Sequence, residues 1–171
     1  MKRIGEILIE NGSITATQLE AALQFQKKTP GKLIGKILIE LGYLTEEEIV
    51  IALSTQFNVP YLPLANFAFN ESNEKLIPKE LIAKYLCVPL ERIGNLLTLV
   101  MSDPTNEEAI RAIEASTKAK VQTFVATTSE ITKVLEQYFH IDASSVKRGS
   151  ENMTTSIRNA SHNQPKTVQK P

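Results

Sequence analysis

Residues 4–12, Ile4-Gly5-Glu6-Ile7-Leu8-Ile9-Glu10-Asn11-Gly12, recur thirty positions later as residues 34–42, Ile34-Gly35-Lys36-Ile37-Leu38-Ile39-Glu40-Leu41-Gly42. The repeat continues beyond the glycine, where the matching pairs are Thr15 and Thr45, Leu19 and Ile49, Ala22 and Ala52, Leu23 and Leu53, and Gln26 and Gln56. Such a tandem duplication predicts two copies of one structural unit that pack together, or that jointly hold a ligand with its own twofold character.

Each copy is predicted to form a helical hairpin. Its first half carries apolar residues at helical spacing and ends on a glycine, Gly12 or Gly42. Its second half begins with a capping box, in which a threonine oxygen accepts a backbone N–H and a Gln or Glu side chain reaches back. The two boxes are Thr15-Ala16-Thr17-Gln18 and Thr45-Glu46-Glu47-Glu48. The segment Thr29-Pro30-Gly31 is predicted to separate the two copies.

The chain divides into three regions that differ in composition and hydrophobic pattern. Residues 1–58 hold the duplicated helical unit, residues 59–140 alternate between helical and extended patterns, and residues 141–171 lose their apolar side chains. We expect this last region to be a disordered, mildly basic tail, because it cannot bury enough apolar surface to offset the cost of ordering. The predicted fold class is α+β, with an N-terminal helical subdomain of two tandem helical hairpins followed by a small α/β sandwich subdomain.

The second region begins with a connector over residues 59–63. The elements predicted after it are a helix over 78–85, strands around 86–90 and over 96–101, a helix starting at Ser102-Asp103-Pro104, a strand over 121–125 and a capped helix over 129–139. Gly94-Asn95 between the first two strands is a hairpin signal.

Composition excludes several functions. The chain has 19 Lys plus Arg and 19 Asp plus Glu, so no global charge attracts a DNA or RNA polymer or an anionic membrane. No stretch approaches the eighteen or so apolar residues of a membrane-spanning helix, and no export signal is indicated. The single cysteine, Cys87, fits a reducing compartment. We therefore expect a cytoplasmic protein.

Catalytic motifs are missing from the sequence. The glycine-rich stretch over residues 31–37 is one residue short of a phosphate-binding loop, and it ends in Ile37 where the loop needs a hydroxyl. The two histidines, His140 and His162, lie at or in the tail, and no Cys or His grouping has metal-ligand spacing. We expect no enzyme activity and no metal or cofactor.

The two copies also carry a longer motif. The first copy reads Arg3-Ile4-Gly5, Leu8-Ile9, Gly12, Ile14, Leu19, Leu23 and Gln26; the second reads Ile34-Gly35, Leu38-Ile39, Gly42, Tyr43-Leu44, Ile49, Leu53 and Gln56. Over roughly residues 1 to 140, including Leu99–Asn106, the chain resembles the N-terminal regulatory domain of the hexameric ATPases that power type II secretion and type IV pilus extension. That domain is expected here as a stand-alone domain or as a fragment.

The resemblance implies a ligand, because in some members of that family this domain is a receptor for cyclic di-GMP bound by both motif copies. The implied ligand-binding residues are Arg3, Ile4, Gly5, Leu19, Leu23, Gln26, Ile34, Gly35, Ile49, Leu53 and Gln56. Their chemistry suits a twofold dinucleotide. An arginine offers a planar fork to phosphate or to the O6/N7 edge of guanine, a glutamine amide both donates and accepts, and aliphatic side chains cover base faces.

Each of these residues also has a purely structural interpretation. The leucines and isoleucines could form the core of a four-helix unit, Gln26 and Gln56 could be solvated, and Arg3 could be a loose surface charge. The second copy has Leu33 in place of Arg3, so one phosphate contact is expected to be missing unless Lys32 or Lys36 substitutes.

Two functions therefore remain open at this point. The first is a sensor that binds cyclic di-GMP and relays this to a partner, such as a secretion or pilus ATPase. The second is a ligand-free docking module that attaches to an inner-membrane platform protein of a secretion or pilus system.

Overall fold

The structure is a computed structural model that describes residues 2–143, so the predicted tail lies outside the described residues from residue 144 onward. Two separate hydrophobic clusters form its interior. One is built from the duplicated N-terminal helices and includes Leu8 and Leu38, and the other lies around the sheet and includes Leu99, Phe139 and Ile141. The division of the chain at residues 58 and 140 stays a prediction.

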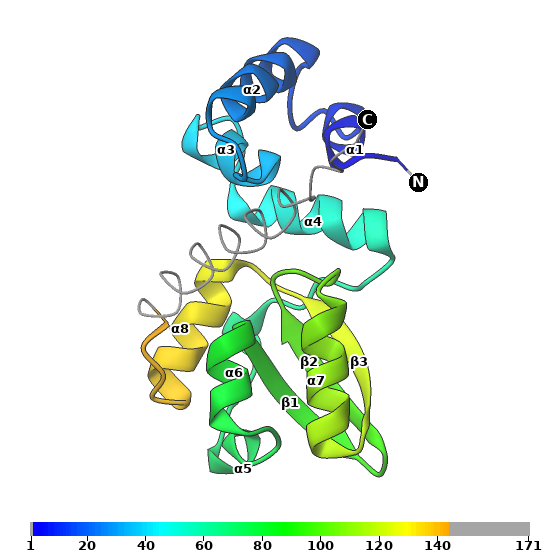
Figure 1. Ribbon diagram of the computed structural model, residues 1–171, viewed down its shortest axis with the longest axis vertical. Coiled ribbons are helices and arrows are strands. Elements are labelled where there is room, and N and C mark those ends of the chain that lie inside the picture. Colours follow the sequence, from blue (N-terminus) through cyan, green and yellow to red (C-terminus); the bar gives the residue numbers. More distant parts are fainter. Residues whose placement is uncertain (1, 144–171) are drawn as a thin grey trace, which may run out of the picture.

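The N-terminal unit consists of the two tandem helical hairpins that the repeat predicts. Its helices are α1 (Ile4–Glu10), α2 (Ala16–Lys28), α3 (Ile34–Glu40) and α4 (Glu46–Phe57). Thr15 and Thr45 cap α2 and α4 through the expected capping boxes, and Gly12 and Gly42 adopt φ values of +72° and +71°. Across the hairpins, α2 contacts α3 and α1 contacts α4. Figure 1 shows α4 between the other three helices and the sheet.

The second unit is a three-stranded sheet covered by helices, which confirms the predicted α+β class. Its elements are η1 (Leu64–Asn66), α5 (Glu71–Glu74), α6 (Lys79–Tyr85), β1 (Cys87–Ile93), β2 (Leu96–Met101), α7 (Glu107–Thr117), β3 (Lys120–Val125) and α8 (Thr128–Tyr138). The strand order is β1-β2-β3, with β1 antiparallel and β3 parallel to β2. In Figure 1, α6 and α7 lie side by side in front of the sheet.

Local sequence explains how these strands connect. Gly94 has φ +59° and stands first in the two-residue turn between Ile93 and Leu96, the place where a type II′ hairpin turn takes glycine. The parallel strands β2 and β3 need a crossover, which α7 supplies. Cys87 to Leu90 are buried in succession, as in a strand that is covered on both faces.

The start of α7 differs from the prediction. The sequence places it at Ser102-Asp103-Pro104, whereas the helix begins at Glu107. The carboxylate of Asp103 accepts hydrogen bonds from the backbone N–H of Thr105 at 2.9 Å and from its hydroxyl at 2.5 Å, which holds a turn in this segment. Asn106 is the true N-cap, because its side-chain oxygen accepts the N–H of Ala109 at 3.1 Å.

The connector over residues 59–63 does more than join the two units. Tyr61 forms a parallel bridge with Val125 of β3. The N–H of Val125 donates to the Pro60 carbonyl at 2.9 Å, and the N–H of Leu62 donates to the Val125 carbonyl at 2.9 Å. The connector therefore extends the sheet at the end of β3 and ties the helical unit to it.

Cys87 provides a test of the sheet core. Burial raises the pKa of its thiol from 9.0 to about 12, so in the folded protein the side chain stays a neutral thiol and the reactive thiolate does not form. We expect the native chain to resist alkylation by iodoacetamide at pH 8 and the urea-unfolded chain to react fully. Between pH 9 and 12 the Cys87 thiol ionises in the unfolded chain but not in the folded one. The stabilisation that this group contributes to the free energy of unfolding is therefore lost as the pH rises from 9 towards 12. Rapid labelling of the native chain would contradict this placement.

Candidate ligand-binding site

The two motif copies have matching local contacts. Lys2 pairs with Glu10 at 2.7 Å in the first copy, and Lys32 pairs with Glu40 at 2.6 Å in the second. Because these positions are also thirty residues apart, the duplication extends to the ion pairs on the surface. Both pairs are partly or fully exposed, so their contribution to stability is small.

The glutamines of the motif connect one copy to the other. The Nε2 of Gln26, near the end of α2, donates to the carbonyl of Lys32 just before α3, at 2.7 Å. The Nε2 of Gln56, at the end of α4, donates to the carbonyl of Lys2 just before α1, at 3.0 Å. Exchange of the two copies, which replaces Gln26 by Gln56 and Lys32 by Lys2, converts the first bond into the second. The four helices therefore form a ring with an approximate twofold relation, in which the end of each copy holds the start of the other.

This ring changes how the motif residues are grouped. In the sequence, Arg3 and Gln26 belong to the same copy, but the structure brings the segment before α1 to Gln56. We define the Arg3 half by Arg3, Ile4, Leu53 and Gln56, and the Leu33 half by Leu33, Ile34, Leu23 and Gln26. The two halves correspond to each other through the repeat, and each combines residues from both copies.

Each repeated glycine lies beside a side chain from the second helix of its own hairpin. A Cβ atom built on Gly5 would lie 2.8 Å from Cδ2 of Leu19, and one on Gly35 would lie 3.2 Å from Cδ1 of Ile49. The absence of a side chain at these positions therefore leaves room for the side chains of Leu19 and Ile49. Gly5, Leu19, Gly35 and Ile49 are therefore packing residues of the helical unit.

The other predicted residues differ in exposure. Ile4, Ile34 and Leu53 are half-buried against the helical core, whereas Leu23 is 42% exposed and Leu33 is 73% exposed. An apolar side chain as exposed as Leu33 contributes little to folding. Leu23 and Leu33 are thus available to contact another molecule, while the three half-buried residues serve the core.

A free positive charge of this site lies at Arg3. Its backbone N–H donates to a Glu6 carboxylate oxygen at 2.8 Å, but within residues 2–143 its exposed guanidinium has no hydrogen-bond or ion-pair partner. Lys32 is already paired with Glu40, so its ammonium is a poor replacement for the missing arginine at Leu33. Lys36 is exposed and, within the same residues, unpaired. The Arg3 half is therefore better equipped for an anion than the Leu33 half.

The glutamine contacts lead to a prediction about stability. Gln56→Ala removes the bond that closes the ring, and we expect it to lower the free energy of unfolding by about 0.5–1.5 kcal/mol. Amide hydrogen exchange over residues 2–6 should become faster, because this segment loses its hydrogen bond to α4. Urea unfolding and hydrogen exchange measure the two effects. Gln24→Ala is the matched control, since Gln24 is exposed on α2 and, among residues 2–143, makes no such bond. Equal effects from the two variants would contradict the role of Gln56.

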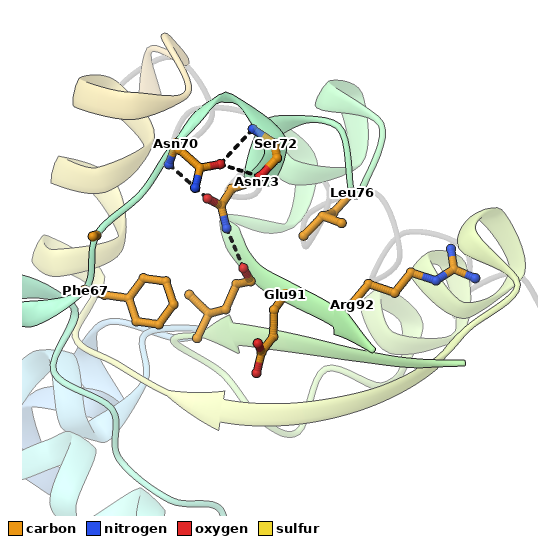
Figure 2. Close-up of a pocket in the computed structure, with 9 residues that line it drawn as sticks. Phe67, Asn70, Ser72, Asn73, Leu76, Glu91 and Arg92 are labelled. Atoms are coloured by element: carbon orange, nitrogen blue, oxygen red, sulfur yellow. Dashed lines mark hydrogen bonds between the residues drawn. The ribbon is translucent and has the colours of Figure 1, made fainter. Parts of the chain in front are cut away.

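Two pockets lie in the α/β unit, away from the motif residues. One holds about 380 Å³ between the segment around α5 and the end of β1, where Figure 2 shows Phe67, Asn70, Ser72, Asn73, Leu76, Glu91 and Arg92. The other holds about 200 Å³ between η1 and α8. The larger pocket is lined by Arg92, whose guanidinium donates to the carbonyls of Gly94 and Thr117, both at 3.1 Å. These bonds already use part of its hydrogen-bonding capacity. None of the predicted ligand residues lines either pocket.

Among residues 2–143, no group of three or more His, Cys, Asp and Glu side chains is placed to hold a metal ion. None of the helices in the same part of the chain combines the length and apolar character needed to span a membrane.

The sequence of residues 57–145 matches the MshEN domain family. Curated relatives are type IV pilus assembly ATPases PilB. The chain is 34% identical over 137 residues to that of Myxococcus xanthus (strain DK1622) and 30% identical over 132 residues to that of Acinetobacter baylyi. These alignments cover 80% and 77% of the chain but only 24% and 23% of the relatives, so the chain spans about a quarter of their length.

Solved structures share the fold. A structure of MshE with cdg (cyclic di-GMP) matches with a TM-score of 0.71 and 27% identity, and it covers 81% of this chain and 99% of that one. A structure of the N-terminal domain of XpsE matches with a TM-score of 0.64 and 21% identity over 80% of this chain and 93% of that one, which supports the fold alone. Both structural alignments are longer than the segment that matches the family, and they therefore include part of the duplicated helices.

Proposed function

This chain belongs to the MshEN domain family, and we propose that it is a non-catalytic regulatory domain of the cytoplasm that binds cyclic di-GMP through its two helical hairpins. The observation that carries the proposal is the approximate twofold relation of the ring, with Gln26 bound to Lys32 and Gln56 bound to Lys2. Cyclic di-GMP has two guanines and two phosphates related by a twofold axis. Two corresponding halves of one protein surface suit the two halves of such a ligand. The likeness to MshE with cdg supports the same ligand.

The residues of the two halves supply the groups that this ligand needs. The free guanidinium of Arg3 offers a planar fork to a phosphate or to the O6/N7 edge of a guanine. Each motif glutamine uses its N–H to hold the neighbouring backbone, which leaves its side-chain oxygen to accept a bond from a guanine N–H. The exposed side chains of Leu23 and Leu33 cover the flat face of a base.

The two halves contribute differently to ligand binding, because their residues differ. The Arg3 half provides the charged, directional contact, whereas the Leu33 half provides apolar cover and the exposed ammonium of Lys36. A compact ammonium does not reproduce a bidentate contact, so the Arg3 half carries more of the binding energy.

Isothermal titration calorimetry of the full chain with cyclic di-GMP tests this function. The proposal requires heat of binding with one ligand per chain, because the two halves hold a single dinucleotide. Cyclic di-AMP is the matched control, since it has the same ring and charge but lacks the guanine O6, and we expect it to bind more weakly. The absence of heat at millimolar cyclic di-GMP would overturn the proposal.

A second function follows from the exposed apolar residues. Leu23, Phe25 and Leu33 all project into solvent from α2 and the start of α3, and such residues are also suited to a protein contact. In this alternative the chain docks on a secretion or pilus ATPase, or on an inner-membrane platform protein, with or without the dinucleotide. A pull-down against these components tests it, with Leu33→Ser as the variant that should reduce capture. Capture of none of these components would contradict docking.

A further inference from the structure

Helix α4 contacts both units, α1 in the helical unit and β3 in the sheet unit. Ile49, Ala52 and Leu53 belong to the helical cluster. Glu46 and Val50, four residues apart, are neighbours at the edge of the stripe that these residues form along the helix. Val50 is 4% exposed yet belongs to neither hydrophobic cluster, and α4 contacts β3. This edge of α4 therefore lies towards the sheet unit, in agreement with the position of the helix in Figure 1.

Glu46 makes a polar contact between the two units. Its carboxylate oxygen accepts the backbone N–H of Ser129, in the first turn of α8, at 3.0 Å. The first N–H groups of a helix have no partner within it, and a carboxylate at this end is also favoured by the helix dipole. The hydroxyl of Thr127 accepts a second N–H of this turn, that of Glu130. An acidic residue of the helical unit thus completes the cap of a helix in the α/β unit.

The first turn of α8 also holds the connector. The Glu130 carboxylate accepts the N–H of Leu64 at 3.3 Å and lies 3.4 Å from the hydroxyl of Tyr61. The same carboxylate accepts the N–H and the hydroxyl of Thr127 at 3.0 and 2.8 Å. Helix α4 and the connector therefore meet the α/β unit at one helix end. Glu46 supplies the contact from α4 to that end.

The far end of α4 carries Gln56, which holds the segment that precedes Arg3. One helix therefore joins the Arg3 half of the proposed site to the first turn of α8. We propose that Glu46 is a coupling residue, through which occupation of the Arg3 half is transmitted to α8. This proposal rests on the function proposed above, because it needs a ligand at that half. A ligand moves such a contact only if it binds one arrangement of α4 better than another, so the coupling is measurable as a difference between the free and bound protein.

Hydrogen exchange of the full chain, with and without cyclic di-GMP, tests the proposal. In the wild type we expect the ligand to slow exchange at the starts of α1 and α3 and also over residues 128–132 in α8. In Glu46→Ala the first effect should remain and the second should be lost. Glu46→Gln keeps a neutral acceptor and should fall between them. Glu47→Ala is the matched control, because Glu47 is an exposed neighbour that, within residues 2–143, makes no hydrogen bond or ion pair.

The free protein gives a second readout. Without ligand, the Ser129 amide should exchange about 5- to 10-fold faster in Glu46→Ala than in the wild type, because it loses its acceptor. The coupling alone would be overturned by either of two results. In the first, the ligand slows exchange only in the helical unit of the wild type; in the second, the ligand still slows exchange in α8 of Glu46→Ala. The absence of protection anywhere in the wild type would overturn the proposed ligand and the coupling with it. An unchanged Ser129 exchange rate would overturn the contact itself.

Discussion

Replacement of Arg3 by alanine is expected to weaken cyclic di-GMP binding by roughly 10- to 150-fold, the equivalent of about 1.5–3 kcal/mol for a charged hydrogen bond. The guanidinium is exposed and, among residues 2–143, unpaired, so it is available to the ligand without first breaking another contact. For the same reason the variant should unfold at the same urea concentration as the wild type. The backbone bond from Arg3 to Glu6 does not involve the side chain and remains possible. Calorimetric titration of the two proteins in one buffer measures the difference.

Two further variants show which property of the arginine matters. Arg3→Lys keeps the charge but not the planar fork, and should recover only part of the lost affinity. Leu33→Arg places a guanidinium at the corresponding position of the other half and should tighten binding by up to about tenfold. A dissociation constant that Arg3→Ala leaves unchanged would remove Arg3 from the site.

The second large effect concerns the helical core. Leu38→Ala should lower the free energy of unfolding by about 2–5 kcal/mol, because Leu38 is fully buried and its truncation leaves a cavity. Leu8 is its counterpart in the first copy and is equally buried, so Leu8→Ala should have a similar effect. Urea unfolding followed by far-UV circular dichroism measures both.

Leu23→Ala is the control for this core. Leu23 is 42% exposed, so its loss should cost less than about 1 kcal/mol in the free protein. A large cost for Leu23 together with a small one for Leu38 would contradict the packing of the helical unit.

Local patterns predict most of the individual elements. The hairpins, their capping boxes and the left-handed glycines follow from residues within one turn of each other, such as Thr15 with Gln18. Strand β2 begins and ends at the predicted residues, because its apolar run is bounded by a glycine turn and by Asp103. The start of α7 was misplaced because Asp103 and Asn106 are both good helix caps, and only the structure shows which one caps the helix.

Long-range contacts were not predictable from the sequence. The bond from Gln56 to Lys2 spans 54 residues, and nothing local indicates that the second copy closes on the first. The contact from Glu46 to Ser129 spans 83 residues, and in the sequence Glu46 is only one of three acidic residues behind a cap. The repeat identified the residues of the candidate site, but their grouping into an Arg3 half and a Leu33 half depends on the ring.

We propose that one cyclic di-GMP molecule lies across both halves of the helical ring. NMR chemical-shift mapping tests it directly, and a chain of 19.0 kDa is well suited to the method. We expect the ligand to shift the backbone amides of residues 3–5 and 33–35, together with the side-chain amides of Gln26 and Gln56, at one ligand per chain. Shifts that cluster instead around the pocket between α5 and β1, or in only one half of the ring, would contradict it.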